Sequence, residues 1–186
     1  MKNWIVFGSQ TFTEVNCIRK ALGKDPDLII TNRTNLIGVN DEILVECKDK
    51  FVFLPAKPSW DDYRKVFKKY SPLFENCVVT LNGYLRILLP EVCSFFKEKK
   101  ITCLNGHPGY LPKYPWLVGK DPQKRAYEAG CPTAGSIIHE VVAEVDAGRL
   151  LASKEISIEG MTLDEVYEAL HNNSINLWIE YLRGIL

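Results

Sequence analysis

The stretch 77-CVVTLNG-83 decides the fold class of this chain. An uncharged run is followed by Asn-Gly, which is the pattern of a short strand that is buried on both faces and closed by a turn. Similar apolar runs occur at 4–7, 28–30 and 101–104. Continuous apolar runs of this kind are typical of parallel strands, because helices cover both faces of a parallel sheet.

Helical patterns separate these runs. Apolar residues recur at helical spacing in 15–22. The segment 60–70 is charged, with its apolar residues on one face, which is typical of an amphipathic helix. Pro90 suits the first turn of a helix over 90–100, whose last turn is basic. Strands that alternate with helices predict an α/β chain with a mostly parallel sheet and helices on both faces. Residues 43–45 and 51–54 are weaker strand candidates.

The chain shows no repeat and no domain boundary, so we expect a single domain over 1–186. Thr162 and Glu165 form the sequence signature of a capping box, which predicts the start of a long final helix after Met161. The other expected elements are an ordered loop over a cleft at 109–123, a short helix at 124–129, and paired β segments at 136–142 and 149–158.

Composition excludes several classes of protein. The 186 residues are 46% hydrophobic and 25% charged, which is typical of a globular domain and not of a disordered chain. The formal net charge is zero, so the chain lacks the basic field that drives nucleic-acid binding. No apolar run approaches the roughly 20 residues of a membrane-spanning helix, and the N-terminus does not resemble a signal peptide.

The six cysteines are widely spaced and form no CxxC pair, which excludes zinc-ribbon and thioredoxin motifs. We interpret them as reduced thiols of a cytoplasmic protein and as small buried side chains. The positions are Cys17, Cys47, Cys77, Cys93, Cys103 and Cys131. We expect no metal, because the sequence offers no cluster of ligands.

Two predicted strands end in polar residues, at Asn82-Gly83 and at 105-NGH-107. Ligands of parallel sheets bind beyond the carboxyl ends of the strands. Asn105 and His107 are two residues apart, so extended backbone presents an amide and an imidazole on the same side. Such a donor pair suits a developing oxyanion. The alternative is that Asn-Gly and His-Pro are ordinary turn sequences.

The segment 144-EVDAG-148 places a carboxylate beside small residues, as in a loop that passes close to a ligand. Asp146 is a candidate to orient His107 or to move protons, although Asp-Ala-Gly is also a common hairpin turn. The combination of Asn105, His107 and Asp146 is more specific than any one of them. We interpret His139 as a structural histidine inside a strand, and His171 as part of a solvated helix face.

The segment 8-GSQTF-12 follows the first strand and could bind a phosphate through backbone N–H groups. It has one glycine, so the glycine-rich fingerprints of dinucleotide and ATP sites are both absent. Nicotinamide and ATP are therefore poor candidates as cofactors.

Four motifs in order, 83-GYLRIL-88, 105-NGHPGYLPKYP-115, 124-KRAYEAG-130 and 135-GSIIHEVVAEVDAG-148, resemble the folate-dependent formyltransferase family. In length and motif order the chain is most similar to the branch that formylates glycinamide ribonucleotide. The resemblance implies a Rossmann-like formyltransferase fold. It also implies transfer of a formyl group from 10-formyltetrahydrofolate to an amine.

The resemblance also implies roles for individual residues. Asn105, His107 and Asp146 match the catalytic residues of the family, where the first two stabilise the oxyanion and the third helps to move the proton. The positions implied to bind folate are Leu85, Arg86, Ile87, Leu88, Val142 and Glu144. The alternative for 85–88 is an apolar connection that only packs. Gly8, Ser9 and Gln10 would bind the acceptor.

The match is incomplete on the acceptor side. Only Gly8 matches the glycine-rich phosphate segment of the purine branch, and Trp60 stands where that branch has a basic residue near the folate tail. We therefore expect the acceptor to be glycinamide ribonucleotide, an amino-sugar nucleotide or another small amine, and the sequence does not choose among them. Formyltetrahydrofolate hydrolysis and a non-catalytic binding module remain as alternatives, and we expect a monomer or homodimer.

Overall fold

The computed structural model describes residues 2–186, which divide into two compact units. One unit runs up to Leu104 and includes Ile185 and Leu186, and the other spans Asn105–Gly184. The division into two compact units does not decide the number of domains, so one domain over 1–186 stays a prediction.

The first unit has a parallel arrangement of strands in the order β3-β2-β1-β4. The strands are β1 (Asn3–Gly8), β2 (Leu28–Thr31), β3 (Phe51–Phe53) and β4 (Cys77–Leu81). Phe7 of β1 lies opposite Leu81 of β4, so the next residues, Gly8 and Asn82, lie at the same edge of the sheet. The apolar runs at 4–7, 28–30 and 77–81 are buried, as their patterns predicted.

Helices α3 and α5 of this unit follow the predicted patterns. The helices are α1 (Thr13–Leu22), α2 (Asp41–Cys47), α3 (Trp60–Lys69), α4 (Ser71–Phe74) and α5 (Pro90–Glu98), with a short 3₁₀ turn η1 (Lys48–Lys50). Ser59 and Asp62 form a capping box at the start of α3, and Pro90 opens α5.

The strand prediction for 43–45 is wrong, because these residues lie inside α2. Asn40 caps this helix, since its Oδ1 accepts a hydrogen bond from the Ile43 N–H at 3.2 Å. Ile43 is buried while Val45 is 81% exposed. A helix buries only one of these apolar residues, whereas the short run by itself resembles a strand.

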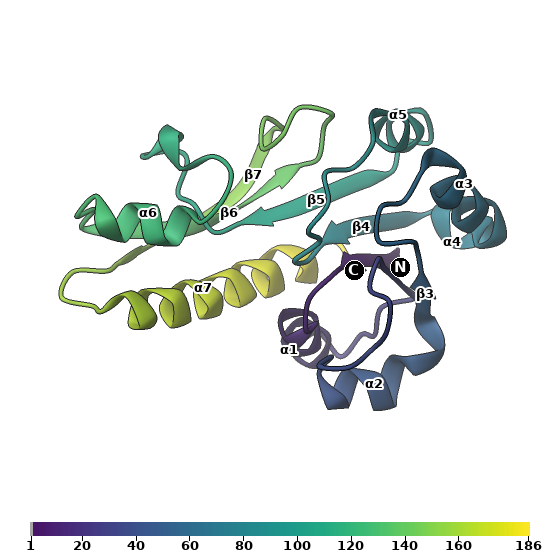
Figure 1. The fold of residues 1–186 in the computed structure, drawn as a ribbon, viewed down its shortest axis with the longest axis horizontal. Helices are drawn as coiled ribbons and strands as arrows, with labels where there is room; N and C mark the ends of the chain where they lie inside the picture. The colour runs from purple at the N-terminus through teal and green to yellow at the C-terminus, as the bar shows by residue number, and fades with distance from the viewer. Residues whose placement is uncertain (1) are drawn as a thin grey trace. The chain divides into compact units, whose positions relative to one another are not determined.

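The strand β5 (Thr102–His107) contributes residues to both units, and it is longer than the predicted apolar run. In the second unit the strand order is β5-β6-β7, and β6 (Thr133–Glu140) pairs antiparallel with β7 (Leu150–Ser157). The register shifts between Ile138 and His139, which marks an irregularity near the end of β6. Figure 1 shows β6 and β7 side by side.

The remaining elements of the second unit are η2 (Pro115–Leu117), α6 (Pro122–Glu128) and α7 (Leu163–Arg183). Thr162 and Glu165 form the predicted capping box of α7. This helix packs along β6, β7 and α6. Val166 and Leu170 of its inner face join a buried core with one residue each from η2, α6, β6 and the segment after β7: Leu117, Ala126, Ala134 and Ile158. The fold-class prediction, an α/β chain with a mostly parallel sheet, is confirmed.

All six cysteines are free, and three of them are buried: Cys47, Cys77 and Cys103. No helix within residues 2–186 combines the length and the apolar character that a membrane crossing requires.

Candidate active site

Four polar side chains meet in the second unit. Asn105 and His107 occupy alternate positions of β5, His139 lies near the end of β6, and Asp146 lies in the β6–β7 connection. Alternate residues of a strand share a face, so the intervening Gly106 faces the other way. A Cβ at Gly106 would lie 2.6 Å from the Trp178 Nε1 atom, so glycine lets α7 pack against this strand.

Both ring nitrogens of His107 face polar groups. Its Nε2 atom lies 2.9 Å from the Leu117 carbonyl oxygen. A carbonyl only accepts, so Nε2 carries the hydrogen and Nδ1 carries a lone pair in the neutral ring. The Nδ1 atom lies 3.7 Å from the Asp146 Oδ2 atom, which is beyond direct hydrogen-bond distance. Burial lowers the pKa of His107, and this effect outweighs the opposing effect of Asp146.

His139 links Asn105 to Asp146. Its Nδ1 atom donates to the Glu140 carbonyl oxygen at 2.9 Å, which leaves Nε2 as the acceptor in the neutral ring. That Nε2 atom lies 3.2 Å from the Asn105 Nδ2 atom and 3.5 Å from the Asp146 Oδ1 atom. An amide nitrogen has two hydrogens, so Asn105 keeps a second N–H for another acceptor.

Asp146 is the carboxylate that both histidines face. It has a left-handed backbone with φ of 52°, and its side chain is only 9% exposed. Its Oδ2 atom accepts a hydrogen bond from the Gly119 N–H at 3.1 Å. The contact of His139 with Asp146 Oδ1, followed by the nearby His107, lowers the pKa of Asp146 despite burial. Asp146 is therefore ionised at neutral pH.

The structure brings together the three predicted catalytic residues, and it adds His139. The interpretation of His139 as only a structural histidine did not foresee its contacts with Asn105 and Asp146. The ionised carboxylate and the two imidazoles can accept and hold a proton. The amide N–H beside them can stabilise a negative oxygen. Within residues 2–186, no group of three or more His, Cys, Asp or Glu side chains is arranged to hold a metal ion.

The predicted acceptor residues lie in the first unit. The Ser9 Oγ atom donates to the Asn32 Oδ1 atom at 2.5 Å and accepts from the Leu85 N–H at 3.0 Å. The Arg33 guanidinium donates to the carbonyl oxygens of Ser9, at 3.2 Å, and Gln10, at 3.1 Å. The same guanidinium also donates to the carbonyl oxygens of Asn35 and Ile37, which follow β2. The loop therefore turns carbonyl groups, and not only N–H groups, toward its neighbours.

The residues that the resemblance assigns to folate differ in exposure. Leu85 is 65% exposed and Ile87 71%, whereas Leu88 is buried. The Arg86 Nε atom donates to the Ala56 carbonyl oxygen at 2.9 Å. In the second unit, Val142 and Glu144 are both exposed. Exposed apolar side chains leave surface for a ligand, whereas Leu88 fits the alternative that it packs.

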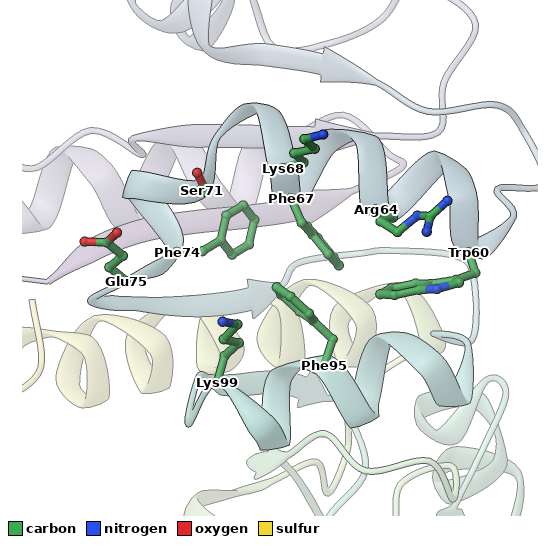
Figure 2. Close-up of a pocket in the computed structure, with 9 residues that line it drawn as sticks. All are labelled: Trp60, Arg64, Phe67, Lys68, Ser71, Phe74, Glu75, Phe95 and Lys99. Atoms are coloured by element: carbon green, nitrogen blue, oxygen red, sulfur yellow. The ribbon is translucent and has the colours of Figure 1, made fainter.

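A cavity of about 540 Å³ lies in the first unit, among α3, α4 and α5. Figure 2 shows the rings of Phe67 and Phe95 facing each other in its centre, and the two rings are stacked at 4.7 Å. Trp60 and Phe74 extend this aromatic lining, and Lys68 is among its charged residues. None of the predicted site residues lines this cavity.

Comparison with known proteins gives the class of this chain. The sequence model of the formyl transferase family matches residues 5–182, which is nearly the whole chain. The chain therefore belongs to the formyl transferase family of group-transfer enzymes.

Individual relatives match over shorter stretches. A methionyl-tRNA formyltransferase of Thermotoga maritima is 35% identical over 109 residues, which is 58% of this chain and 33% of that protein. A phosphoribosylglycinamide formyltransferase of Haemophilus influenzae is 37% identical over 81 residues, which is 44% of this chain and 35% of that protein. The matched region thus spans about a third of the length of these relatives.

Solved structures confirm the fold over the full chain. Glycinamide ribonucleotide transformylase 1 from Geobacillus kaustophilus has a TM-score of 0.82 at 24% identity, with 100% of this chain and 99% of that chain covered. Phosphoribosylglycinamide formyltransferase from Bacillus halodurans has a TM-score of 0.81 at 23% identity, with 100% and 95% covered. The Rossmann-like formyltransferase fold that the sequence motifs implied is therefore confirmed.

Proposed function

We propose that this chain is an N-formyltransferase that moves a formyl group from 10-formyltetrahydrofolate to a primary amine. The observation that carries the proposal is the set of Asn105, His107, His139 and Asp146 in a chain of the formyl transferase family. These side chains supply a donor for a negative oxygen and groups that accept and return a proton, which are the needs of acyl transfer.

In the proposed reaction the neutral amine attacks the formyl carbon, so a C–N bond forms and the formyl oxygen becomes negative. Asn105 donates its second amide N–H to that oxygen. His107 takes the amine proton on Nδ1, and the nearby carboxylate of Asp146 stabilises the resulting imidazolium. The bond to the folate nitrogen then breaks, and the proton passes to that nitrogen. One N-formyl bond is exchanged for another, so no oxidant or reductant is required.

The folate side of the proposal rests on the sequence resemblance. Leu85, Arg86, Ile87 and Leu88 of the first unit, with Val142 and Glu144 of the second, are the proposed folate-binding positions. The exposure of Leu85 and Ile87 supports this role for them.

Glycinamide ribonucleotide is the first candidate acceptor, because relatives named phosphoribosylglycinamide formyltransferase match this chain. This acceptor would place the enzyme in purine biosynthesis. The second candidate is an amino-sugar nucleotide or another small amine, because only Gly8 matches the glycine-rich phosphate segment of the purine branch and the Ser9 N–H already donates to the Gly83 carbonyl oxygen at 3.1 Å. A methionyl-tRNA acceptor is the weaker candidate, because the formal net charge is zero.

The cellular setting is also proposed. Six unpaired thiols suit the reducing cytoplasm, where the enzyme would act as a monomer or a homodimer.

The test is incubation of the protein with 10-formyltetrahydrofolate and one acceptor at a time, with release of tetrahydrofolate as the measurement. The acceptors are glycinamide ribonucleotide, an amino-sugar nucleotide, methionyl-tRNA and water alone. We expect turnover with one small amine and slow release with water. Rapid formate release with no amine would instead identify a hydrolase, and no turnover together with no folate binding would contradict the proposal.

Variants connect the activity to the site. Asn105→Ala removes an oxyanion donor and should lower kcat by about a hundredfold. His107→Gln should have an effect at least as large. The matched control is His171→Gln, because His171 is exposed on α7 and should leave kcat unchanged.

A further inference from the structure

The loop from Trp116 to Lys120 contacts the catalytic residues at two points. The Leu117 carbonyl accepts a hydrogen bond from His107 Nε2 at 2.9 Å, and the Gly119 N–H donates to Asp146 Oδ2 at 3.1 Å. These groups set the direction of the imidazole and of the carboxylate. Whatever fixes this loop therefore also fixes the distance between His107 and Asp146.

Arg125 of α6 holds the same loop from another direction. Its Nη1 atom donates to the carbonyl oxygens of Val118, at 2.8 Å, and Lys120, at 3.4 Å. Its Nη2 atom donates to the Trp116 carbonyl oxygen, and the guanidinium lies 5.7 Å from the centre of the Trp116 ring.

The contacts alternate along the loop. Carbonyl groups of the even-numbered residues 116, 118 and 120 go to Arg125. Groups of the odd-numbered residues Leu117 and Gly119 go to His107 and Asp146. A planar guanidinium presents several N–H donors in a fixed fork, so one side chain can fix three carbonyl groups together. Fixing the even-numbered carbonyls turns the odd-numbered groups toward the catalytic pair.

We propose that Arg125 is a positioning residue for formyl transfer, which holds His107 and Asp146 in their reactive arrangement through the loop 116–120. This inference rests on the function proposed above, and it adds a residue that touches neither His107 nor Asp146 by any hydrogen bond in the described part of the chain.

Arg125 also acts on His107 by its charge. The charged and titratable groups that face the His107 ring are Asp146 of the β6–β7 connection, His139 of β6 and Arg125 of α6. Burial is the main cause of the lowered pKa of His107, and the Arg125 cation lowers it further. Loss of the cation alone should raise the pKa of His107, whereas loss of the Leu117 hydrogen bond, which has the larger effect on this pKa, should lower it. A lower pKa of His107 in an Arg125 variant therefore reports displacement of the loop.

The experiment compares Arg125→Met, Arg125→Lys and a control, Lys124→Met. Lys124 is the neighbouring cation on α6, is 50% exposed and lies 3.7 Å from Glu128, so the control removes the same charge away from the loop. Three readouts apply: kcat and KM for the amine, the pKa of His107 by NMR, and hydrogen exchange of the Leu117 and Gly119 amides. The chain has only three histidines, so His107→Gln assigns the ring signal.

For Arg125→Met we expect kcat to fall by about tenfold to a hundredfold, because small displacements of reacting groups have effects of this size. KM should stay within about twofold, the pKa of His107 should fall because its hydrogen bond to Leu117 weakens, and the loop amides should exchange faster. Arg125→Lys keeps the charge without the fork, so kcat and the pKa of His107 should both still fall. Lys124→Met should match the unmodified protein in all readouts.

Unchanged kcat, an unchanged pKa of His107 and unchanged exchange in a folded Arg125→Met variant would overturn the proposal. Equal effects of Lys124→Met would overturn it too, since the effect would then belong to α6 in general. If Arg125→Met does not fold, Arg125→Lys decides by the same measurements. If the unmodified protein transfers no formyl group, the function proposed above fails, while the NMR and exchange measurements still test whether Arg125 positions His107.

Discussion

At the scale of single residues, His107 and Asp146 predict how stability depends on pH. Burial lowers the pKa of His107 below its ordinary 6.5, so the unfolded chain binds this proton more readily than the folded chain. The contribution to stability is complete above about pH 6.5 and is lost as the pH falls toward the folded pKa. The pKa of Asp146 is lowered from 3.8, so its contribution is lost in a second, more acidic range.

We therefore expect the free energy of unfolding to decrease as the pH falls from 7 to 5. His107→Gln should flatten this decrease, because the residue no longer titrates. Urea unfolding at several pH values measures both chains. An equal slope in His107→Gln would show that other groups cause the loss.

At the scale of elements, the start of α7 gives a second prediction. The Thr162 Oγ1 atom accepts from the Glu165 N–H at 3.4 Å, and the Glu165 carboxylate accepts from the Thr162 N–H at 2.7 Å. Thr162→Ala removes the side-chain acceptor and should lower the free energy of unfolding by about 1 kcal/mol. Thr162→Ser keeps the hydroxyl and should cost much less. Equal losses in the two variants would contradict the capping role.

The contact between β5 and α7 gives a third prediction. A Cβ at Gly106 would lie 2.6 Å from Trp178 Nε1, whereas a Cβ at Gly184 meets only ordinary contact at 3.7 Å. Gly106→Ala should lower the free energy of unfolding by about 1–3 kcal/mol, and it should reduce kcat by displacing Asn105 and His107. Gly184→Ala is the control and should change neither quantity. Full activity of Gly106→Ala would show that the strand absorbs the added methyl group.

The elements also show what the sequence could predict. The buried strands and α7 were predictable, because continuous apolar runs and a capping box are local signals. The helix at 41–47 was not, since its apolar residues are adjacent and the cap at Asn40 has no apolar periodicity beside it. The proximity of Asn105, His107 and Asp146 was predictable from strand ends and the family motifs. The contacts of His139 with the other site residues depend on the register shift of β6 and on distances across the unit, which no local pattern contains.

At the scale of the whole molecule, the expectation of a single domain predicts one cooperative unfolding transition. The chain forms two compact units, and β5 contributes residues to both. Unfolding of either unit therefore disrupts a strand to which both units contribute residues. Unfolding curves from far-UV and near-UV circular dichroism should coincide. Two separated transitions would show that the units unfold independently.

The left-handed backbone of Asp146, with φ of 52°, has a practical consequence. Asparagine is nearly the same size as aspartate and adopts this conformation readily, whereas alanine does so only with strain. Asp146→Asn thus removes the negative charge and leaves the main chain in place. The rate of that variant measures the electrostatic part of the carboxylate's role, and the further loss in Asp146→Ala measures the distortion of the connection.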